Sequence, residues 1–477
     1  MTTRKLKITV PLIIVVAGVG ILVFFFSRGQ EEEFQLIPKD RSVKQAGGEV
    51  AGTEVGTGWS IKENPEEAVR EAVQMALEGK ENKTPDFAVI FVSSGTEAEA
   101  VLFEARKILG SATKIYGGTS DSRAVMTDKG FVKVAKKGYV RAPMTGNRGL
   151  AVMTITSQDI LFGVGSASFS TYPSIQDASK AAILSAIRSA GKPRDELPRI
   201  VLATLTAGME DEVIEGIEEV VGKNSVILGG TSGGPAFGVF GENKVYHEGV
   251  SLAVIYTDLP VGWTFEGGFD VTDPHTGVVT KVEGQAIVEI DNRPALDVYD
   301  EWLGGKIEEL YEEVADPARI RDLLILHPFY RKYTSSSGQD YFLFSHPWPK
   351  DETLKDRSIM TSTRIKAVER IYLSHGTWET FINRIGNLPT KAKVQGGIEI
   401  GSRPLFGIGY ICAGVMGVIP ETERQKLPLL MNYANHEAPF IGSFTWGECG
   451  QFPGIGNKHG NLLTSFVVIG HKEQALR

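Results

Sequence analysis

The sequence predicts an α/β protein with an internally duplicated mixed-sheet module, followed by a smaller α+β domain and preceded by one transmembrane helix. Three observations predict this class. A run of nineteen uncharged residues lies near the N-terminus, a strand–helix–strand pattern occurs twice about 112 positions apart, and the pattern changes after residue 270. The length of 477 residues agrees with several domains, because one domain usually holds about 100–200 residues.

The composition excludes several classes of protein. Hydrophobic residues make up 42% and charged residues 23%, which are globular values and exclude disorder throughout the chain. The net charge is −8 and no long basic run occurs, so binding to nucleic-acid phosphates is not expected. Two cysteines allow at most one disulfide and exclude a disulfide framework.

The apolar run at residues 8–26 (ITVPLIIVVAGVGILVFFF) predicts a transmembrane signal-anchor. A helix of this length spans roughly 28 Å, close to the ~30 Å hydrocarbon core of a bilayer. The basic tail at residues 1–7 is expected in the cytoplasm, which predicts a single-pass membrane protein with extracytoplasmic soluble domains. A cleaved signal peptide is the alternative, but the run is long for one and no small-residue cleavage site follows it. Residues 27–57 are polar and predict a tether.

The duplicated module is predicted at residues 58–270. Each copy has a helix and then an apolar run that ends in Ser/Thr–x–Gly, at residues 85–95 and 198–208, as expected of a buried strand. A second helical pattern follows, and then KIYGGTS (114–120) or VILGGTS (226–232). Strand–helix–strand crossovers favour parallel pairing, and the antiparallel strands expected after them make the sheets mixed.

Residues 271–477 predict the α+β domain. VVTKVEG and AIVEID indicate a hairpin, and a helix is expected to enter at Pro294 and to end at Gly304 and Gly305. Apolar strands are predicted at residues 405–418 and 462–470.

Short motifs in both parts are similar to those of one family. The chain resembles the FIST (F-box and intracellular signal transduction) sensory-domain family, with FIST N-like and FIST C-like parts. The motifs are FVSSG (91–95), YGGTS and LGGTS, PALDVYDEWLGG (294–305), YICAG (410–414) and GSFTWGECG (442–450). The resemblance implies an input module for small ligands, amino acids among them. Some bacterial members of the family bind haem and sense nitric oxide.

The sequence departs from the family's pattern at one point. Members tend to follow their cysteine with Gly and then Arg, whereas Val415 stands after Gly414 here. Arg403, from the preceding turn, could substitute for that arginine in pairing with an anion. No kinase, cyclase, methyl-accepting or F-box segment accompanies the domain, so the signal is expected to leave through an unknown downstream partner or the membrane helix.

Two Gly-Gly-Thr-Ser motifs are candidate ligand-binding segments. They are expected just beyond the ends of strands, where ligands bind in α/β sheets and where consecutive N–H groups can hold an anion. The alternative is two turns that merely require glycine. The candidate residues are Gly117, Gly118, Thr119, Ser120, Gly229, Gly230, Thr231 and Ser232.

A polar and aromatic cluster near the C-terminus provides further candidates, namely Thr445, Trp446, Glu448, His459 and Asn461. Glu448 could bind a ligand ammonium group, and Trp446 could offer a stacking or cation–π face. The alternative is a hairpin turn with an exposed acid.

Cys412 lies in an apolar strand and is expected to be a buried structural thiol. It is also the candidate nucleophile of an alternative, cysteine-dependent enzyme. The sequence neither predicts nor excludes a disulfide bridge between Cys412 and Cys449. The spacing of His436, Cys449 and His459 fits no zinc pattern, so no metal site is expected. No P-loop, dinucleotide fingerprint, nucleophile elbow or zinc-protease motif occurs.

These observations predict a membrane-anchored, non-enzymatic sensory protein that binds a small polar ligand, such as an amino acid, and relays the signal to a partner. No cofactor is expected. A haem-based nitric oxide sensor, with a histidine as axial ligand, is the second hypothesis.

Overall fold

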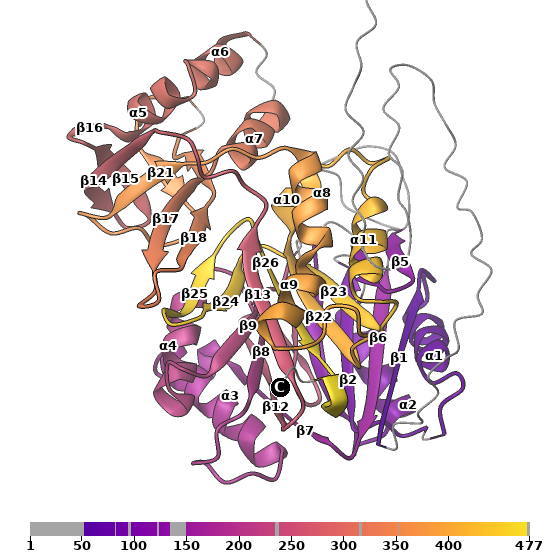
Figure 1. Ribbon diagram of the computed structural model, residues 1–477. Helices are drawn as coiled ribbons and strands as arrows, with labels where there is room; N and C mark the ends of the chain where they lie inside the picture. The colour runs from indigo at the N-terminus through magenta and orange to yellow at the C-terminus, as the bar shows by residue number, and fades with distance from the viewer. Residues whose placement is uncertain are drawn as a thin grey trace, which may run out of the picture. The chain divides into compact units, whose positions relative to one another are not determined.

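The computed structural model describes residues 52–81, 83–93, 97–121, 124–133, 149–233, 238–313, 317–351 and 353–474 (Figure 1). The predicted tail at residues 1–7 and the predicted anchor at 8–26 lie outside these ranges. Within them, no helix is long and apolar enough to cross a membrane. Residues 53–57, predicted as the end of the tether, form the start of an edge strand instead.

The predicted mixed α/β class is confirmed, but the repeated unit occurs three times rather than twice. Each copy consists of an edge strand, one or two helices, a strand, one or two further helices, a parallel strand, a hairpin and a closing strand. The first copy comprises β1 (Thr53–Ser60), α1 (Pro65–Ala76), β2 (Phe87–Ser93), α2 (Ala98–Leu109), β3 (Lys114–Ser120), β4 (Ala124–Thr127), β5 (Gly130–Lys133) and β6 (Leu150–Ser157).

The second copy follows directly and keeps the same order. It comprises β7 (Ile160–Ser168), α3 (Ile175–Ser189), β8 (Ile200–Leu205), α4 (Glu210–Val221), β9 (Val226–Thr231), β10 (Val239–Phe240), β11 (Val245–Tyr246) and β12 (Gly249–Thr257). A short 3₁₀ turn, η1 (Phe169–Thr171), precedes α3. The two copies have the same strand order, β1-β6-β2-β3 and β7-β12-β8-β9.

The third copy is split by an insertion and repeats this strand order as β13-β26-β22-β23. It comprises β13 (Val261–Gly267), α8 (Trp378–Gly386), α9 (Leu388–Gln395), β22 (Phe406–Cys412), α10 (Ala413–Val418), α11 (Lys426–Ala434), β23 (Phe440–Thr445), β24 (Glu448–Phe452), β25 (Gly456–Gly460) and β26 (Leu463–Ile469). A 3₁₀ turn, η2 (Lys472–Gln474), follows. The expected boundary at residue 270 therefore falls inside this copy, because β13 pairs with β26 near the C-terminus.

The three copies interlock through their hairpins, each of which extends the sheet of another copy. Hairpin β4–β5 of the first copy pairs with β23 of the third, and β10–β11 of the second pairs with β3 of the first. Hairpin β24–β25 of the third copy completes the cycle by pairing with β9 of the second. None of the three six-stranded sheets is therefore built from one copy alone.

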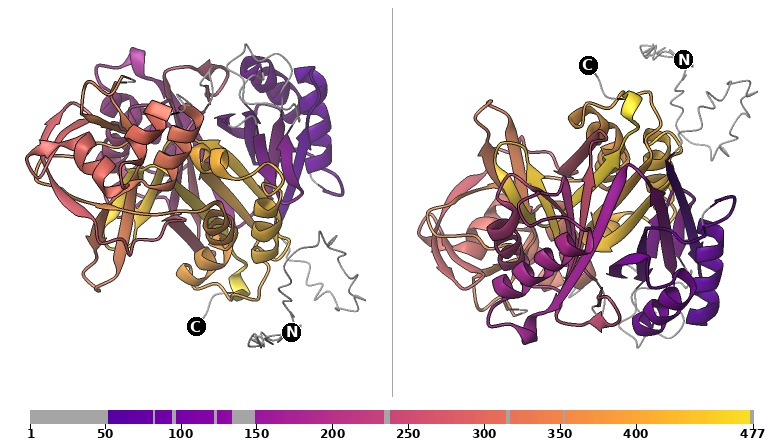
Figure 2. Two further views of the ribbon diagram at one scale, coloured as in Figure 1. Left: turned by 90° about the horizontal axis from the view of Figure 1, so that it is seen from above. Right: turned by 90° about the horizontal axis from the view of Figure 1, so that it is seen from below.

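The inner faces of the three sheets form a shared core, and Figure 2 shows the sheets arranged about a common centre. A buried hydroxyl network joins one side chain from each copy. Thr204 Oγ1 lies 2.7 Å from the hydroxyl of Tyr116, which lies 2.7 Å from the hydroxyl of Tyr410. The helices cover the outer faces, and glycines in the edge strands bring them close. At Gly58, a Cβ would lie 1.9 Å from the carbonyl oxygen of Ala72 in α1.

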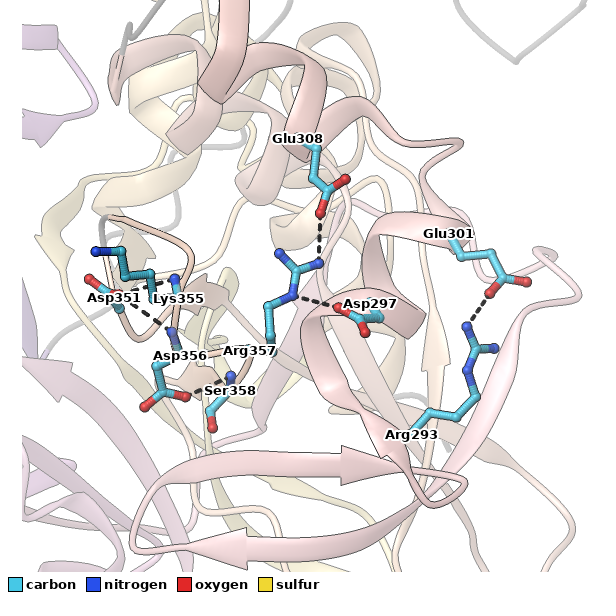
Figure 3. Close-up of polar contacts among 9 residues, drawn as sticks. All are labelled: Arg293, Asp297, Glu301, Glu308, Asp351, Lys355, Asp356, Arg357 and Ser358. Carbon is cyan, nitrogen blue, oxygen red and sulfur yellow. Dashed lines mark hydrogen bonds and ion pairs between the residues drawn. The ribbon is translucent and has the colours of Figure 1, made fainter.

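The insertion forms a lobe between β13 and α8. Its elements are β14 (Thr276–Glu283), β15 (Ala286–Ile290), β16 (Arg293–Pro294), α5 (Ala295–Trp302), α6 (Lys306–Glu313), α7 (Pro317–Leu326), β17 (Phe329–Thr334), β18 (Asp340–Ser345), β19 (Pro347–Pro349), β20 (Ile359–Thr361) and β21 (Arg370–Leu373). The hairpin and the helix predicted at its start are β14–β15 and α5. Arg357 ties α5 to α6, because its guanidinium lies 2.5 Å from Asp297 and 2.8 Å from Glu308 (Figure 3).

Candidate ligand-binding site

The carboxyl ends of β3, β9 and β23 meet where the three copies join. Each end is hydrogen-bonded to the next copy through its backbone, as expected where equivalent strands converge. The bonds run from Asp121 N to Phe444 O (2.8 Å), from Gly233 N to Thr119 O (3.2 Å) and from Trp446 N to Thr231 O (3.2 Å). The carboxyl ends of strands are the usual place for ligands in α/β sheets.

A pocket of about 390 Å³ opens at this point, and we call it the junction pocket. All three copies and the insertion contribute to its walls. The copies supply Asp121, Gly208, Glu210, Cys412, Trp446 and Asn461. The insertion supplies Arg321, His346, Trp348 and Ser362. A ligand in the pocket would therefore contact segments far apart in the sequence.

Trp446 forms an exposed aromatic wall, with 46% of its surface accessible. Its indole Nε1 donates a hydrogen bond to Asp121 Oδ2 at 2.6 Å, which fixes the plane of the ring. The side-chain amide of Asn461 donates to the Trp446 carbonyl oxygen, and Asn461 itself is buried. Trp446 and Asn461, both predicted site residues, are thus held together beside Asp121, an acid that was not predicted.

Glu210 supplies a second carboxylate at the start of α4. Its Oε1 accepts hydrogen bonds from Thr231 Oγ1 at 2.7 Å and from Gly208 N at 3.1 Å. Its Oε2 accepts no hydrogen bond from any other described residue. Because one oxygen anchors the side chain, the other is left to bind a ligand donor.

The insertion adds a cation and an imidazole to the pocket. Arg321 is paired with Asp322 at 2.8 Å and remains partly accessible. Burial, with a smaller effect from the nearby Arg321 charge, lowers the pKa of His346 to about 4. The imidazole is therefore neutral at pH 7, and its Nε2 is buried without a hydrogen-bond partner among the described residues.

Glu448, predicted to bind the ligand, lies behind the pocket wall rather than in it, and the alternative of an exposed acid in a hairpin turn is wrong as well. It is completely buried, because β24 extends the second sheet beside Gly230. Its carboxyl group accepts hydrogen bonds from Thr445 Oγ1 at 2.7 Å and from Leu463 N at 3.1 Å. Burial raises the pKa of Glu448 well above its ordinary value.

Cys412 lies at the edge of the pocket and ends β22. Burial, reinforced by the neighbouring Glu448, raises the pKa of its thiol well above the ordinary value, which disfavours a thiolate at neutral pH. Cys412 and Cys449 are both buried free thiols, so the bridge between them that the sequence left open is not formed.

The Gly-Gly-Thr-Ser motifs were predicted just beyond the strand ends, with turns as the alternative. They instead form the last residues of β3 and β9, except for Ser232, which directly follows β9. Their first glycines allow close approach of parallel strands. A Cβ at Gly117 would lie 1.8 Å from the carbonyl oxygen of Ile90, and one at Gly229 would lie 1.9 Å from that of Ala203. None of the eight motif residues lines the junction pocket. One of them, Thr231, contacts the pocket indirectly, because its hydroxyl positions Glu210.

Two further predicted residues lie away from the pocket. Arg403 is exposed before the amino end of β22, and its guanidinium donates to the carbonyl oxygen of Glu437 at 3.1 Å. His459 is buried in β25, opposite Cys449. Among the described residues, no group of three or more His, Cys, Asp and Glu side chains could hold a metal ion.

The sequence contains signals for two of the pocket residues that were not predicted, Asp121 and Glu210. Asp121 directly follows the first Gly-Gly-Thr-Ser motif, and Glu210 follows Thr-Ala-Gly at 206–208, which matches Cys-Ala-Gly at 412–414. Arg321, His346 and Trp348 belong to the insertion, which has no counterpart in the other copies, so no repeat signal pointed to them.

Comparisons with known proteins identify two domains of one family. A FIST N domain matches residues 86–293, and a FIST C domain matches residues 295–451. No curated protein matches the chain.

Solved structures with detectable similarity include a cyanuric acid hydrolase from A. caulinodans. It is 9% identical with a TM-score of 0.29, and the match covers 88% of this chain and 100% of that one. PurL of T. maritima complexed with ADP is 10% identical with a TM-score of 0.21, over 88% of this chain and 71% of that one. Likeness at these scores carries no conclusion about activity.

Proposed function

The chain belongs to the FIST family, with both its N and C domains, and we propose that it is a sensory protein that binds a small polar ligand in the junction pocket. FIST domains are sensory domains, which supports a role in signal transduction. The observation that carries the proposal is the pocket itself. It has a volume of about 390 Å³ at the meeting point of the copies, with charged side chains of both signs.

The arrangement of charges suits a small zwitterion such as an amino acid. Arg321 can pair with a carboxylate, and Glu210 with an ammonium group through its unoccupied Oε2. Trp446 can add a cation–π contact beside the same ammonium group. Pockets of this size that combine aromatic walls with a few polar groups are typical ligand sites.

Ligand binding would change how the insertion and the copies contact each other, because both contribute walls to the pocket. A ligand that prefers one arrangement shifts the population toward it. We propose that this shift is passed to a downstream partner and that residues 8–26 anchor the protein in a membrane. We propose no catalytic role for Cys412, since its buried thiol is poorly suited to forming a nucleophilic thiolate.

A thermal-shift screen of the full-length chain with amino acids and related metabolites tests the proposal. A ligand that binds only the folded state raises the melting temperature, by an amount set by its concentration relative to Kd. We expect at least one zwitterionic compound to stabilise the protein and Glu210→Gln to reduce that effect. Absence of any shift across a broad panel would contradict ligand sensing at this site.

Haem binding is the second candidate, because His346 offers a neutral imidazole with an unpartnered Nε2 in the pocket wall. The residues around it fit a porphyrin poorly, since Asp121, Glu210 and Arg321 place charges where haem presents apolar faces. We therefore expect protein purified with haem supplied to show no Soret band. A Soret band lost in His346→Gln would favour haem over the polar ligand.

A further inference from the structure

A second pocket, of about 480 Å³, lies between the first and second copies, and we call it the basic pocket. It is bounded by the end of α2 and the start of β3 on one side, and by β7, the end of α3 and the β10–β11 hairpin on the other. It includes Lys114, the first residue of β3, whereas the junction pocket lies beyond the last residue of that strand. A strand of this length spans about 20 Å, so the two pockets lie at opposite ends of β3.

Positive charge predominates in the basic pocket. Its lining includes Arg106, Lys114 and Arg188 but only one acidic residue, Glu242. Within the described part of the chain, neither Lys114 nor Arg188 has an ion-pair partner. These two cations are therefore available to an anionic ligand.

Arg106 is held in place at the wall of the pocket by backbone oxygens. Its guanidinium donates to the carbonyl oxygens of Thr113 at 2.5 Å, Gly110 at 3.1 Å and Glu242 at 3.2 Å. Its Nε is buried and has no partner among the described residues, although buried N–H groups are normally hydrogen-bonded. A guanidinium fixed in this way places a positive charge at a set position in the wall of the pocket.

Hydroxyl groups complete the lining. Ser111, Ser166 and Ser185 border the pocket, and none of them makes a side-chain hydrogen bond to another described residue. Free hydroxyl donors beside arginine and lysine suit the non-bridging oxygens of a phosphoryl group, which accept several charge-assisted hydrogen bonds at once.

The equivalent groove in the third copy shows that the fold does not require this chemistry. That groove lies between β13, α9 and the β24–β25 hairpin, the counterparts of β7, α3 and the β10–β11 hairpin, and has a volume of about 290 Å³. It is lined by aromatic rings, including Trp263, Phe265 and Phe452. Its lysine, Lys391, is paired with Glu266. The cation of this groove is thus paired, whereas Lys114 and Arg188 of the basic pocket have no ion-pair partner among the described residues.

We propose that the basic pocket binds a phosphorylated small molecule, whose phosphoryl oxygens are held by Lys114 and Arg188 and by the adjacent serine hydroxyls. This site is separate from the junction pocket, and the proposal does not depend on the function proposed for that pocket.

Calorimetric titration of the full-length chain with inorganic pyrophosphate tests this assignment. We expect saturable binding that weakens as NaCl is raised from 50 to 300 mM, since the contacts are electrostatic. Arg188→Gln and Lys114→Gln should each weaken binding about tenfold or more, as expected when one charge-assisted contact is lost. Arg194→Gln, an exposed arginine in the loop after α3, is the matched control and should bind normally.

A variant that leaves the charge unchanged and a different anion serve as further controls. Ser185→Ala removes one hydroxyl without a change of charge and should weaken binding severalfold with no change in the melting temperature of the free protein. Citrate, a carboxylate polyanion, should bind more weakly than pyrophosphate. The proposal is overturned by the absence of pyrophosphate binding, by binding that the pocket variants leave unchanged, or by citrate binding as tightly.

Discussion

Protonation of His346 should destabilise the protein as the pH falls, and the size of the effect follows from its burial. The pKa of His346 is lowered to about 4, mainly by burial and secondarily by the Arg321 charge, whereas an unfolded histidine titrates near 6.5. Between pH 6.5 and pH 4 the unfolded state binds more protons than the folded state. The stability that depends on a neutral His346 is therefore fully present above pH 6.5, and the free energy of unfolding decreases as the pH falls toward 4. At pH 5 the loss in the free energy of unfolding amounts to about 1–2 kcal/mol, allowing for the partial exposure of the residue.

Urea unfolding of wild type and His346→Gln at pH 7 and pH 5 measures this loss. Glutamine cannot titrate, so the variant should lose about 1–2 kcal/mol less than wild type between the two pH values. His247→Gln, at an exposed position, is the control for removing a histidine and should follow the wild-type curve. Parallel pH dependence of wild type and His346→Gln would refute a neutral, buried imidazole in the pocket wall.

Three further predictions concern the fold and its thiols. Gly229→Ala places a methyl group 1.9 Å from a carbonyl oxygen of β8 and should lower the free energy of unfolding, measured in urea, by about 1–3 kcal/mol. The control Gly401→Ala has no neighbour within 4 Å and should lower it little. Equal effects of the two substitutions would contradict the packing described. Cys412 should resist iodoacetamide at pH 7 until urea unfolds the chain, and rapid labelling of the native protein would show a reactive thiolate. Arg357→Ala removes the ion pairs of Arg357 with Asp297 in α5 and with Glu308 in α6. It should lower the free energy of unfolding by about 1 kcal/mol at low salt and by less at 1 M NaCl, whereas an effect independent of salt would indicate lost packing instead.

Repetition in the sequence predicted much of the first two copies, because their strands and motifs lie at a constant spacing. The third copy was missed for two reasons. Its edge strand β13 is separated from the rest by the insertion, and its motif reads Phe-Ile-Gly-Ser-Phe-Thr at 440–445 instead of ending in Gly-Gly-Thr-Ser. The exchange of hairpins could not be foreseen either, since pairing between distant segments leaves no local signal.

The site was predicted in part. Cys412, Trp446 and Asn461 line the junction pocket, and strand register places Cys412 where the other copies have Ser93 and Thr206. Glu448 was predicted to bind the ligand but lies behind the pocket wall, because β24 pairs with β9 of another copy, and this pairing leaves no local signal in the sequence. The charged groups from the insertion were missed, since only the folded chain brings them to the strand ends.

Binding of a zwitterionic ligand by wild type, Glu210→Gln and Arg321→Gln is the most direct test of the junction pocket as a receptor site. Calorimetric titration with the most stabilising compound of the thermal-shift screen should give one site per chain. Each variant should weaken binding about tenfold or more, because each removes one charged contact to the ligand. Undiminished affinity in both variants, with their folding intact, would place the ligand elsewhere and contradict the account.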